Sequence, residues 1–183
     1  GKKLYFASDF HLGAPDHATS RAREEKIISW LNFASKDAAA IFLVGDIFDF
    51  WFEYRKVIPK GFTRTLGAIA KLTDAGLPIY LLPGNHDLWM KQYFEHELGV
   101  KIIRDQACII CGNKRIFLAH GDGLGPGDHK FKFIKRFFIS PLFQWIFKWI
   151  HPDVGVSIAQ KWSAKSRDFK KQEALQNIES EQL

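Results

Sequence analysis

Residues 78–87 read PIYLLPGNHD, and the change from apolar to polar residues within this stretch decides the fold. Its first five residues have the length and apolar composition of a buried strand, and a Pro-Gly turn ends that strand. An amide, an imidazole and a carboxylate follow at once, at Asn85, His86 and Asp87. Alone, this pattern fits a turn with a helix cap, so the rest of the chain must decide between a cap and a functional site.

Two similar strands precede this one in the chain. Residues 3–7 and 40–44 are short apolar runs, and helical periodicity marks residues 20–35 and 62–75, which separate the three strands. We also expect a short helix over residues 88–97. Alternating strands and helices are typical of a parallel sheet covered by helices, so the predicted fold class is α/β.

The chain then continues with further strands. Residues 100–119 have strand character with a hairpin turn at Gly112-Asn113, and the final strand, residues 116–119, stops at His120. After residue 128 the sequence becomes aromatic and basic, and we expect helices there. We therefore divide the chain into a core at residues 1–128 and a helical segment at residues 129–183.

Polar side chains stand where each of the four main strands ends. The strand ends read SDFHLG, GDIFDFW, PGNHD and AHGDG, and besides the residues named above they carry Asp9, His11, Asp46, Asp49, His120 and Asp122. Ligands of open α/β sheets bind outside the carboxyl ends of the strands, so we expect these groups to converge at one edge of one sheet. Independent caps at four successive strand ends are a poor explanation. Carboxylates and imidazoles together favour a divalent ion such as Mn, Fe, Zn or Mg.

The two aspartates of GDIFDFW have different expected roles. A strand-end carboxylate such as Asp46 is suited to bridge two cations, because two such ions close together need an anion between them. We interpret Asp49 as structural, because it lies one helical turn further on.

The motifs D-x-H, GD-x-x-D, GNHD and H-G, in this order over residues 9 to 122, resemble those of the calcineurin-like metallophosphoesterases. These are two-metal phosphoester hydrolases, and the resemblance implies an α/β/β/α sandwich. It also implies that Asp9 and His11 ligate one metal, that Asp46 bridges both, and that Asn85 and His120 ligate the second.

The same resemblance implies two catalytic residues. His86 would stabilise charge on the phosphoryl group or assist the leaving group, and Asp87 would orient the His86 imidazole or cap the following helix. Two divalent ions suit this chemistry because they activate water and clamp both oxygens of an in-line displacement. A neutral ligand such as Asn85 leaves net positive charge for an anionic phosphate.

One motif of the family has no counterpart in this sequence. The family pattern ends with G-H-x-H, which supplies one histidine to each metal, and none of the seven histidines here stands in such a motif. We therefore expect the chain to be part of a longer protein, with the C-terminal strands and the last metal motif of the sandwich missing. The site would then have one histidine fewer at each metal.

The segment 129–155, HKFKFIKRFFISPLFQWIFKWIHPDVG, contains no acidic residue before Asp153. At about 100° per residue, the Phe and Ile side chains of residues 131–138 share one helix face and the Lys and Arg side chains the other. Ser140-Pro141 suits the start of a second helix. Two interpretations stay open: helices that pack on the core or on a partner subunit, and a lipid-facing hairpin with its basic residues near anionic head groups. A nucleic-acid surface is weaker, because the aromatics cluster with aliphatics and not with the charges.

A narrower resemblance rests on GDIFDFWFEY, HGDGLGPGDHKFKFIKRFF and a later IAQKWSAKSR, which are similar to the UDP-2,3-diacylglucosamine hydrolases of lipid A synthesis. These enzymes cleave the pyrophosphate of a nucleotide-linked diacylated sugar and release UMP and 2,3-diacylglucosamine 1-phosphate, lipid X. In that family an inserted helical cap takes the acyl chains, and residues 131–150 occupy the corresponding place. Asp128 and Ser166 would contact the glucosamine or its phosphate, with Arg167 or Lys170 near the anionic groups.

The composition is that of a folded protein with a negatively charged partner. The chain of 183 residues is 46% hydrophobic and 25% charged, with a formal net charge of +6. No secretory signal precedes the first strand, and no apolar run approaches the roughly 20 residues of a spanning helix.

Cys108 and Cys111 lie three apart in a predicted strand and therefore point to opposite faces. They predict two structural thiols in a reducing compartment.

The resemblance to these hydrolases, taken with the aromatic and basic segment, implies a peripheral enzyme at the cytoplasmic face of the bacterial inner membrane. It would use two divalent ions, Mn²⁺ first among them, to hydrolyse UDP-2,3-diacylglucosamine, with no nucleic-acid partner. A soluble calcineurin-like phosphodiesterase or nucleotide hydrolase is one alternative, and a non-catalytic binding module on the same fold is another. Some of the hydrolases carry an arginine at the position of His86, which leaves a related branch with another substrate open. The oligomeric state does not follow from the sequence.

Overall fold

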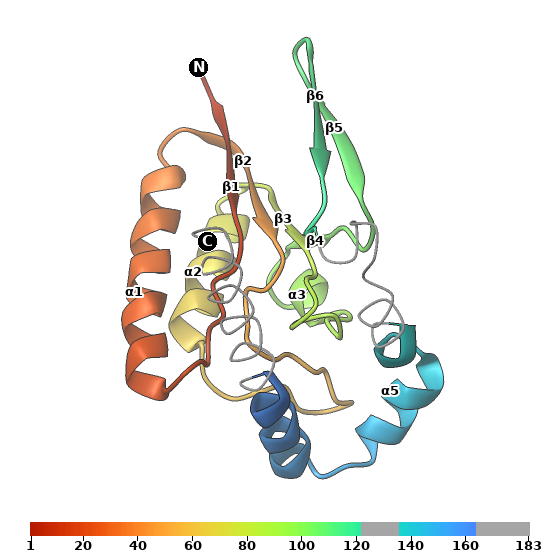
Figure 1. Cartoon of the computed structure of the whole chain (residues 1–183). Coiled ribbons are helices and arrows are strands. Elements are labelled where there is room, and N and C mark those ends of the chain that lie inside the picture. Colours follow the sequence, from red (N-terminus) through yellow and green to blue (C-terminus); the bar gives the residue numbers. More distant parts are fainter. Residues whose placement is uncertain (122–135, 164–183) are drawn as a thin grey trace, which may run out of the picture.

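The computed structural model describes residues 1–121 and 136–163. A four-stranded parallel sheet stands at its centre, in the order β1 (Lys3–Ala7), β2 (Ala38–Val44), β3 (Ile79–Leu82) and β4 (Lys101–Ile102). In the register of the first three strands, Phe42 of β2 lies between Phe6 and Tyr80. The carboxyl ends of these parallel strands point the same way, toward the lower part of Figure 1.

Two helices cover one face of the parallel sheet, α1 (His17–Ala34) and α2 (Thr63–Asp74) (Figure 1). Asp16 caps α1, since its carboxylate accepts a hydrogen bond of 2.8 Å from the Thr19 N–H. Successive residues of a strand point to opposite faces, and those of β2 and β3 that face the helices are buried. The resulting main core includes Leu31, Ile69, Ile41, Leu43, Ile79 and Leu81.

An antiparallel hairpin, β5 (Ala107–Cys111) and β6 (Lys114–Leu118), packs on the other face of the sheet. Leu118 joins Ala40, Phe42 and Leu82 in a second buried cluster. The hairpin turn at residues 112–113 is confirmed, but the strand that leads to His120 belongs to this second sheet and not to the parallel one. An apolar run predicts a strand without predicting its partner, which is why our expectation of a single sheet was wrong.

The two cysteines lie on this hairpin. Both thiols are free and exposed. Cys108 pairs with Phe117 across the hairpin, and Cys111 pairs with Lys114 next to the turn. The expectation that both cysteines lie on a strand is confirmed.

Helix α3 (Tyr93–His96) is much shorter than the helix predicted over residues 88–97. Its start is fixed from a distance, because the buried carboxylate of Glu53 accepts hydrogen bonds from the N–H groups of Lys91, Gln92 and Tyr93 at 2.8, 2.8 and 3.1 Å. No local pattern reveals a cap that comes from another loop.

The C-terminal part contains α5 (Pro141–Lys148) and a further helical stretch over residues 152–163. Pro141 stands at the start of α5 as predicted, after Ser140. Phe147 of α5 is buried against Phe52 and Trp89, so this region packs on the core through one aromatic face. Among the described residues, no helix has the length and hydrophobicity needed to cross a bilayer.

Candidate metal centre

The loops after β1, β2 and β3 run side by side at the carboxyl edge of the sheet. The N–H groups of Asp9 and His11 donate to the carbonyls of Gly45 and Asp46, at 3.1 and 2.9 Å. The loop after β3 joins them, because the His86 N–H donates to Asp46 Oδ1 at 2.9 Å. The three strand-end motifs predicted to meet are therefore in contact.

Two motif glycines allow this close approach. A Cβ on Gly84 would overlap the carboxylate of Asp46 and lie 2.5 Å from its backbone nitrogen. A Cβ on Gly45, whose φ is +81°, would overlap the His120 ring and lie 2.9 Å from the Cα of Gly84. Neither position has room for a side chain, so the glycines of GD and PGN are required by the packing of the loops.

Three of the predicted ligand residues adopt left-handed backbone conformations. Asp9, His11 and Asp46 have φ values of 57°, 44° and 54°. Such angles are uncommon for residues other than glycine and concentrate at functional sites, where the surrounding structure enforces them. The backbone is thus shaped to turn these side chains toward one another.

The side chains converge on one carboxylate. The Nε2 atoms of His120, His11 and His86 lie 3.3, 3.8 and 4.0 Å from Asp46 Oδ2. The His11 Nε2 also lies 3.9 Å from Asp9 Oδ1. Two atoms that each bind one ion at about 2.1 Å, about 90–110° apart, are about 3.0–3.4 Å from each other. The distance of 3.3 Å between His120 and Asp46 falls in this range, and the other three pairs are 3.8–4.0 Å apart, slightly farther than shared ligands would be.

The residues form two candidate ion sites with a common member. His11, Asp46 and His86 make one group, and Asp9, Asp46 and His120 make the other. Since Asp46 belongs to both, it stands where a bridging carboxylate is needed, as predicted for it. The grouping differs from the predicted one, in which Asp9 and His11 share a metal. Carboxylate and imidazole donors around a buried centre fit divalent ions.

Hydrogen bonds fix which nitrogen of two imidazoles faces the centre. His120 Nδ1 lies 3.0 Å from the carbonyl of Val44, and His86 Nδ1 lies 3.0 Å from the carbonyl of Asp49. A carbonyl only accepts, so both Nδ1 atoms carry a proton, which leaves Nε2 as the atom available to an ion or a substrate.

Charge in the centre is set by burial and by these contacts. Burial works against the charged form of Asp46, but the adjacent His120 imidazole and the hydrogen bond from the His86 N–H outweigh it and lower the pKa of Asp46. Burial lowers the pKa of His11, against the nearby charge of Asp46. The centre therefore combines an ionised carboxylate with a neutral imidazole, which are the forms that bind metal.

Asp87 has a different place from the one predicted. Its carboxylate is fully buried and accepts hydrogen bonds from the N–H groups of Gly84 and Ile47 at 2.7 and 2.8 Å, with longer ones from Asp46 and Phe48. Burial and the charge of Asp46 raise its pKa to about 6, against these hydrogen bonds. Asp87 thus ties the loops after β2 and β3 together. It fills neither predicted role, because Glu53 caps the following helix and other residues contact the His86 ring.

Those other residues are Asp49 and Ser163. Asp49 Oδ1 lies 3.8 Å from Nδ1 of both His11 and His86. Ser163 donates to Asp49 Oδ1 at 2.8 Å, and its oxygen lies 3.0 Å from His86 Nδ1. The reason given for interpreting Asp49 as structural was wrong, because residues 46–52 form no helix; the chain instead returns Asp49 to the centre, where it contacts two imidazoles.

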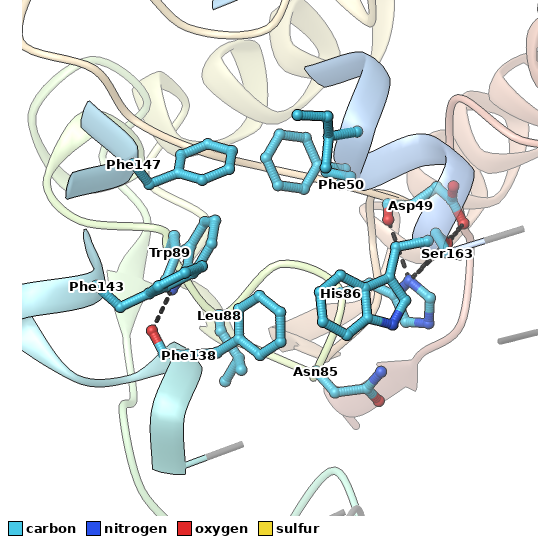
Figure 2. Close-up of a pocket in the computed structure, with 13 residues that line it drawn as sticks. Asp49, Phe50, Asn85, His86, Leu88, Trp89, Phe138, Phe143, Phe147 and Ser163 are labelled. Atoms are coloured by element: carbon cyan, nitrogen blue, oxygen red, sulfur yellow. Dashed lines mark hydrogen bonds and ion pairs between the residues drawn. The ribbon is translucent and has the colours of Figure 1, made fainter. Parts of the chain in front are cut away.

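An apolar pocket of about 240 Å³ opens beside the centre. Figure 2 shows Asn85, His86, Asp49 and Ser163 on one side of it and a group of aromatic side chains on the other. Those aromatic residues are Phe50, Trp89, Phe138, Phe143 and Phe147, and Trp162, Leu88, Ile158 and Ala159 complete the lining. The Trp89 indole is fixed by a hydrogen bond of 2.9 Å to the Phe138 carbonyl.

Some predicted positions lie outside the described residues. They are Asp122, Asp128, Ser166, Arg167 and Lys170, together with residues 131–135 of the predicted amphipathic helix. Asn85 is described and lines the pocket next to His86.

Comparison with known proteins agrees with the motifs. A family model described as calcineurin-like phosphoesterase matches residues 2–177. The chain is similar to a UDP-2,3-diacylglucosamine hydrolase of Porphyromonas gingivalis, with 39% identity over 178 residues, covering 96% of this chain and 68% of that protein. It is also similar to proteins of the same name from Vibrio vulnificus, at 28% identity over 97% of this chain and 71% of that one, and from Vibrio parahaemolyticus, at 31% over 93% and 68%.

Proposed function

Because this chain belongs to the calcineurin-like phosphoesterase family, we propose that it hydrolyses UDP-2,3-diacylglucosamine in lipid A biosynthesis. Water would add across the pyrophosphate, releasing UMP and 2,3-diacylglucosamine 1-phosphate. One observation carries the proposal: His86, which belongs to the metal centre, also lines the apolar pocket, with Asn85 beside it. A nucleotide-linked lipid offers both a pyrophosphate for the centre and acyl chains for the pocket.

The metal ions would be two, with Mn²⁺ as our first choice and Fe, Zn or Mg as alternatives. Asp46 would be shared, and Asp9, His11, Asn85 and His120 would complete the ligands that this chain supplies. When bound, such ions activate water and neutralise charge on the phosphoryl oxygens.

His86 would act on the substrate through Nε2. Its Nδ1 proton is engaged by the Asp49 carbonyl at 3.0 Å, so the ring is fixed in one orientation. When the ring carries a proton on Nε2 in addition to the one held on Nδ1, Nε2 would donate a hydrogen bond to the phosphoryl group or to the leaving oxygen.

The remaining assignments follow the resemblance to the hydrolase family. We propose that residues 1–128 form the catalytic core and residues 129–183 the cap, and that Asp128, Ser166, Arg167 and Lys170 bind the polar part of the substrate. The aromatic pocket between core and cap would take an acyl chain, which favours this function over that of a soluble nucleotide hydrolase.

We further propose that the protein lies peripherally on the cytoplasmic face of the bacterial inner membrane. Several large apolar side chains of the cap are exposed, among them Leu142, Trp145, Ile146 and Trp149. Aromatic and aliphatic side chains of this kind enter the head-group boundary, and the formal net charge of +6 favours anionic lipids.

The double substitution Trp145→Glu, Trp149→Glu is expected to weaken binding to vesicles about a hundredfold, since each aromatic side chain contributes about 1.5 kcal/mol on burial. The measurement is co-sedimentation with vesicles of phosphatidylethanolamine and phosphatidylglycerol. Ile110→Glu is the control, because Ile110 on the distant hairpin is 75% exposed, like Trp149 at 76%. Phe147 of the same helix is left unchanged in this test, because its side chain is buried and does not face a membrane. Equal binding of both variants would contradict the membrane proposal.

The activity itself is tested by release of UMP from the purified lipid nucleotide. We expect release that stops on treatment with a chelator and returns when Mn²⁺ is added. Hydrolysis of simple phosphodiesters or nucleotides without any release of UMP from the lipid nucleotide would favour the soluble phosphodiesterase.

A further inference from the structure

The helical stretch at residues 152–163 turns one face toward the pocket and the metal centre. Ile158, Ala159, Trp162 and Ser163, spaced as on one helix face, all line the pocket. Ser163 is the buried end of this row. It lies 77 positions from His86 and 114 from Asp49 in the sequence, yet it contacts both (Figure 2).

The hydroxyl of Ser163 has a defined role in these contacts. A carboxylate accepts, so Ser163 donates its proton to Asp49 Oδ1 at 2.8 Å. Its lone pairs then face His86 Nδ1 at 3.0 Å. The Nδ1 proton of His86 is therefore shared between the Ser163 oxygen and the Asp49 carbonyl, and no lone pair is left at Nδ1.

We propose that Ser163 is a positioning residue for His86, supplied by the helix that also lines the pocket. Together with Asp49 it holds the imidazole with its proton on Nδ1 and with Nε2 toward Asp46. This inference rests on the proposed function, in which His86 contacts the phosphoryl group. One helix face then serves both the apolar part of the substrate and the reacting centre.

The orientation of the ring is tested without any reaction, by long-range ¹H–¹⁵N spectra of the metal-free protein at about pH 8, where an ordinary imidazole is neutral. The His86 resonances are assigned by their loss in His86→Ala. We expect a pattern with the proton on Nδ1 in the wild type, and nitrogen shifts that move toward each other in Ser163→Ala as the second tautomer becomes populated. Unchanged His86 shifts in Ser163→Ala would overturn the proposal.

Kinetics supply the second test, with metal-loaded protein. Ser163→Ala is expected to lower kcat about tenfold, the effect of one lost hydrogen bond to a group that must stay oriented, with KM changed less than about twofold. Ser163→Thr keeps the hydroxyl and should recover most of the loss. Ser157→Ala is the matched control, because Ser157 is an exposed serine of the same helix whose hydroxyl donates to the Asp153 carbonyl of its own turn. A rise in KM with unchanged kcat would assign Ser163 to helix docking and overturn the proposal.

A double-mutant cycle separates action through His86 from any other route. In a His86→Ala background, Ser163→Ala should change kcat less than about twofold, since the group it positions is gone. A full tenfold loss there would overturn the proposal. If the lipid nucleotide is not hydrolysed at all, the proposed function is wrong. The role of Ser163 is then still decided by the spectra and by the same double-mutant cycle measured with bis-p-nitrophenyl phosphate as substrate.

Discussion

Asp46→Asn is expected to lower kcat for UMP release at least about a thousandfold, because metal ions contribute several kcal/mol of charge stabilisation and each 1.36 kcal/mol is a factor of ten. Asp46 is the one residue common to both candidate ion sites. Asparagine has nearly the same shape and its oxygen still accepts the His86 N–H, so the change removes the charge rather than the packing. Bound metal, measured by elemental analysis after gel filtration, should fall with the activity.

The control for this variant is Asp105→Asn, the same chemical change at an exposed position outside the centre. It should retain both metal and activity. Full metal content in Asp46→Asn would contradict the bridging role of Asp46, even if the activity were lost.

Gly84→Ala is expected to lower kcat at least about a hundredfold and to lower the melting temperature, since overpacking costs about 1–3 kcal/mol and here moves the central carboxylate. The new methyl group would meet the backbone nitrogen of Asp46 at 2.5 Å, and a backbone cannot move aside as a side-chain tip does. The loops after β2 and β3 would separate, and with them Asp46 from His86. Steady-state kinetics and thermal unfolding measure the two effects.

Gly67→Ala is the matched substitution for this test. Gly67 lies inside α2, and a Cβ there meets nothing within 4 Å. Alanine in a helix interior is favoured over glycine by about 0.5–1 kcal/mol, so this variant should be slightly more stable and fully active. An unchanged kcat in Gly84→Ala would contradict the prediction, because the activity would then not depend on the close contact between the loops after β2 and β3.

The strand ends could be predicted because short apolar runs followed by polar residues are local patterns. Asp9, His11, Asp46, His86 and His120 were identified in this way, and the structure brings all five together. The parallel order of the first three strands followed from the helices between them.

What the sequence could not reveal are contacts made between distant segments. The conformation around Asp49 was predicted wrongly because a spacing of three residues suggests a helical turn, whereas the chain there forms a loop that returns to the centre. The start of α3 depends on Glu53 from another loop. Ser163 lies within IAQKWSAKSR, where the resemblance assigned roles to Ser166 and Arg167 but not to Ser163, and only its position against His86 gives it a role.

The left-handed backbone at Asp9, His11 and Asp46 makes stability and activity compete at the same three positions. A non-glycine residue in such a conformation costs of order 1 kcal/mol. Glycine at any of the three would relieve that cost, yet it would delete a proposed metal ligand. Selection for thermostability alone would therefore erode this enzyme first at its metal centre, and a library screened only for folding should accumulate inactive glycine variants there.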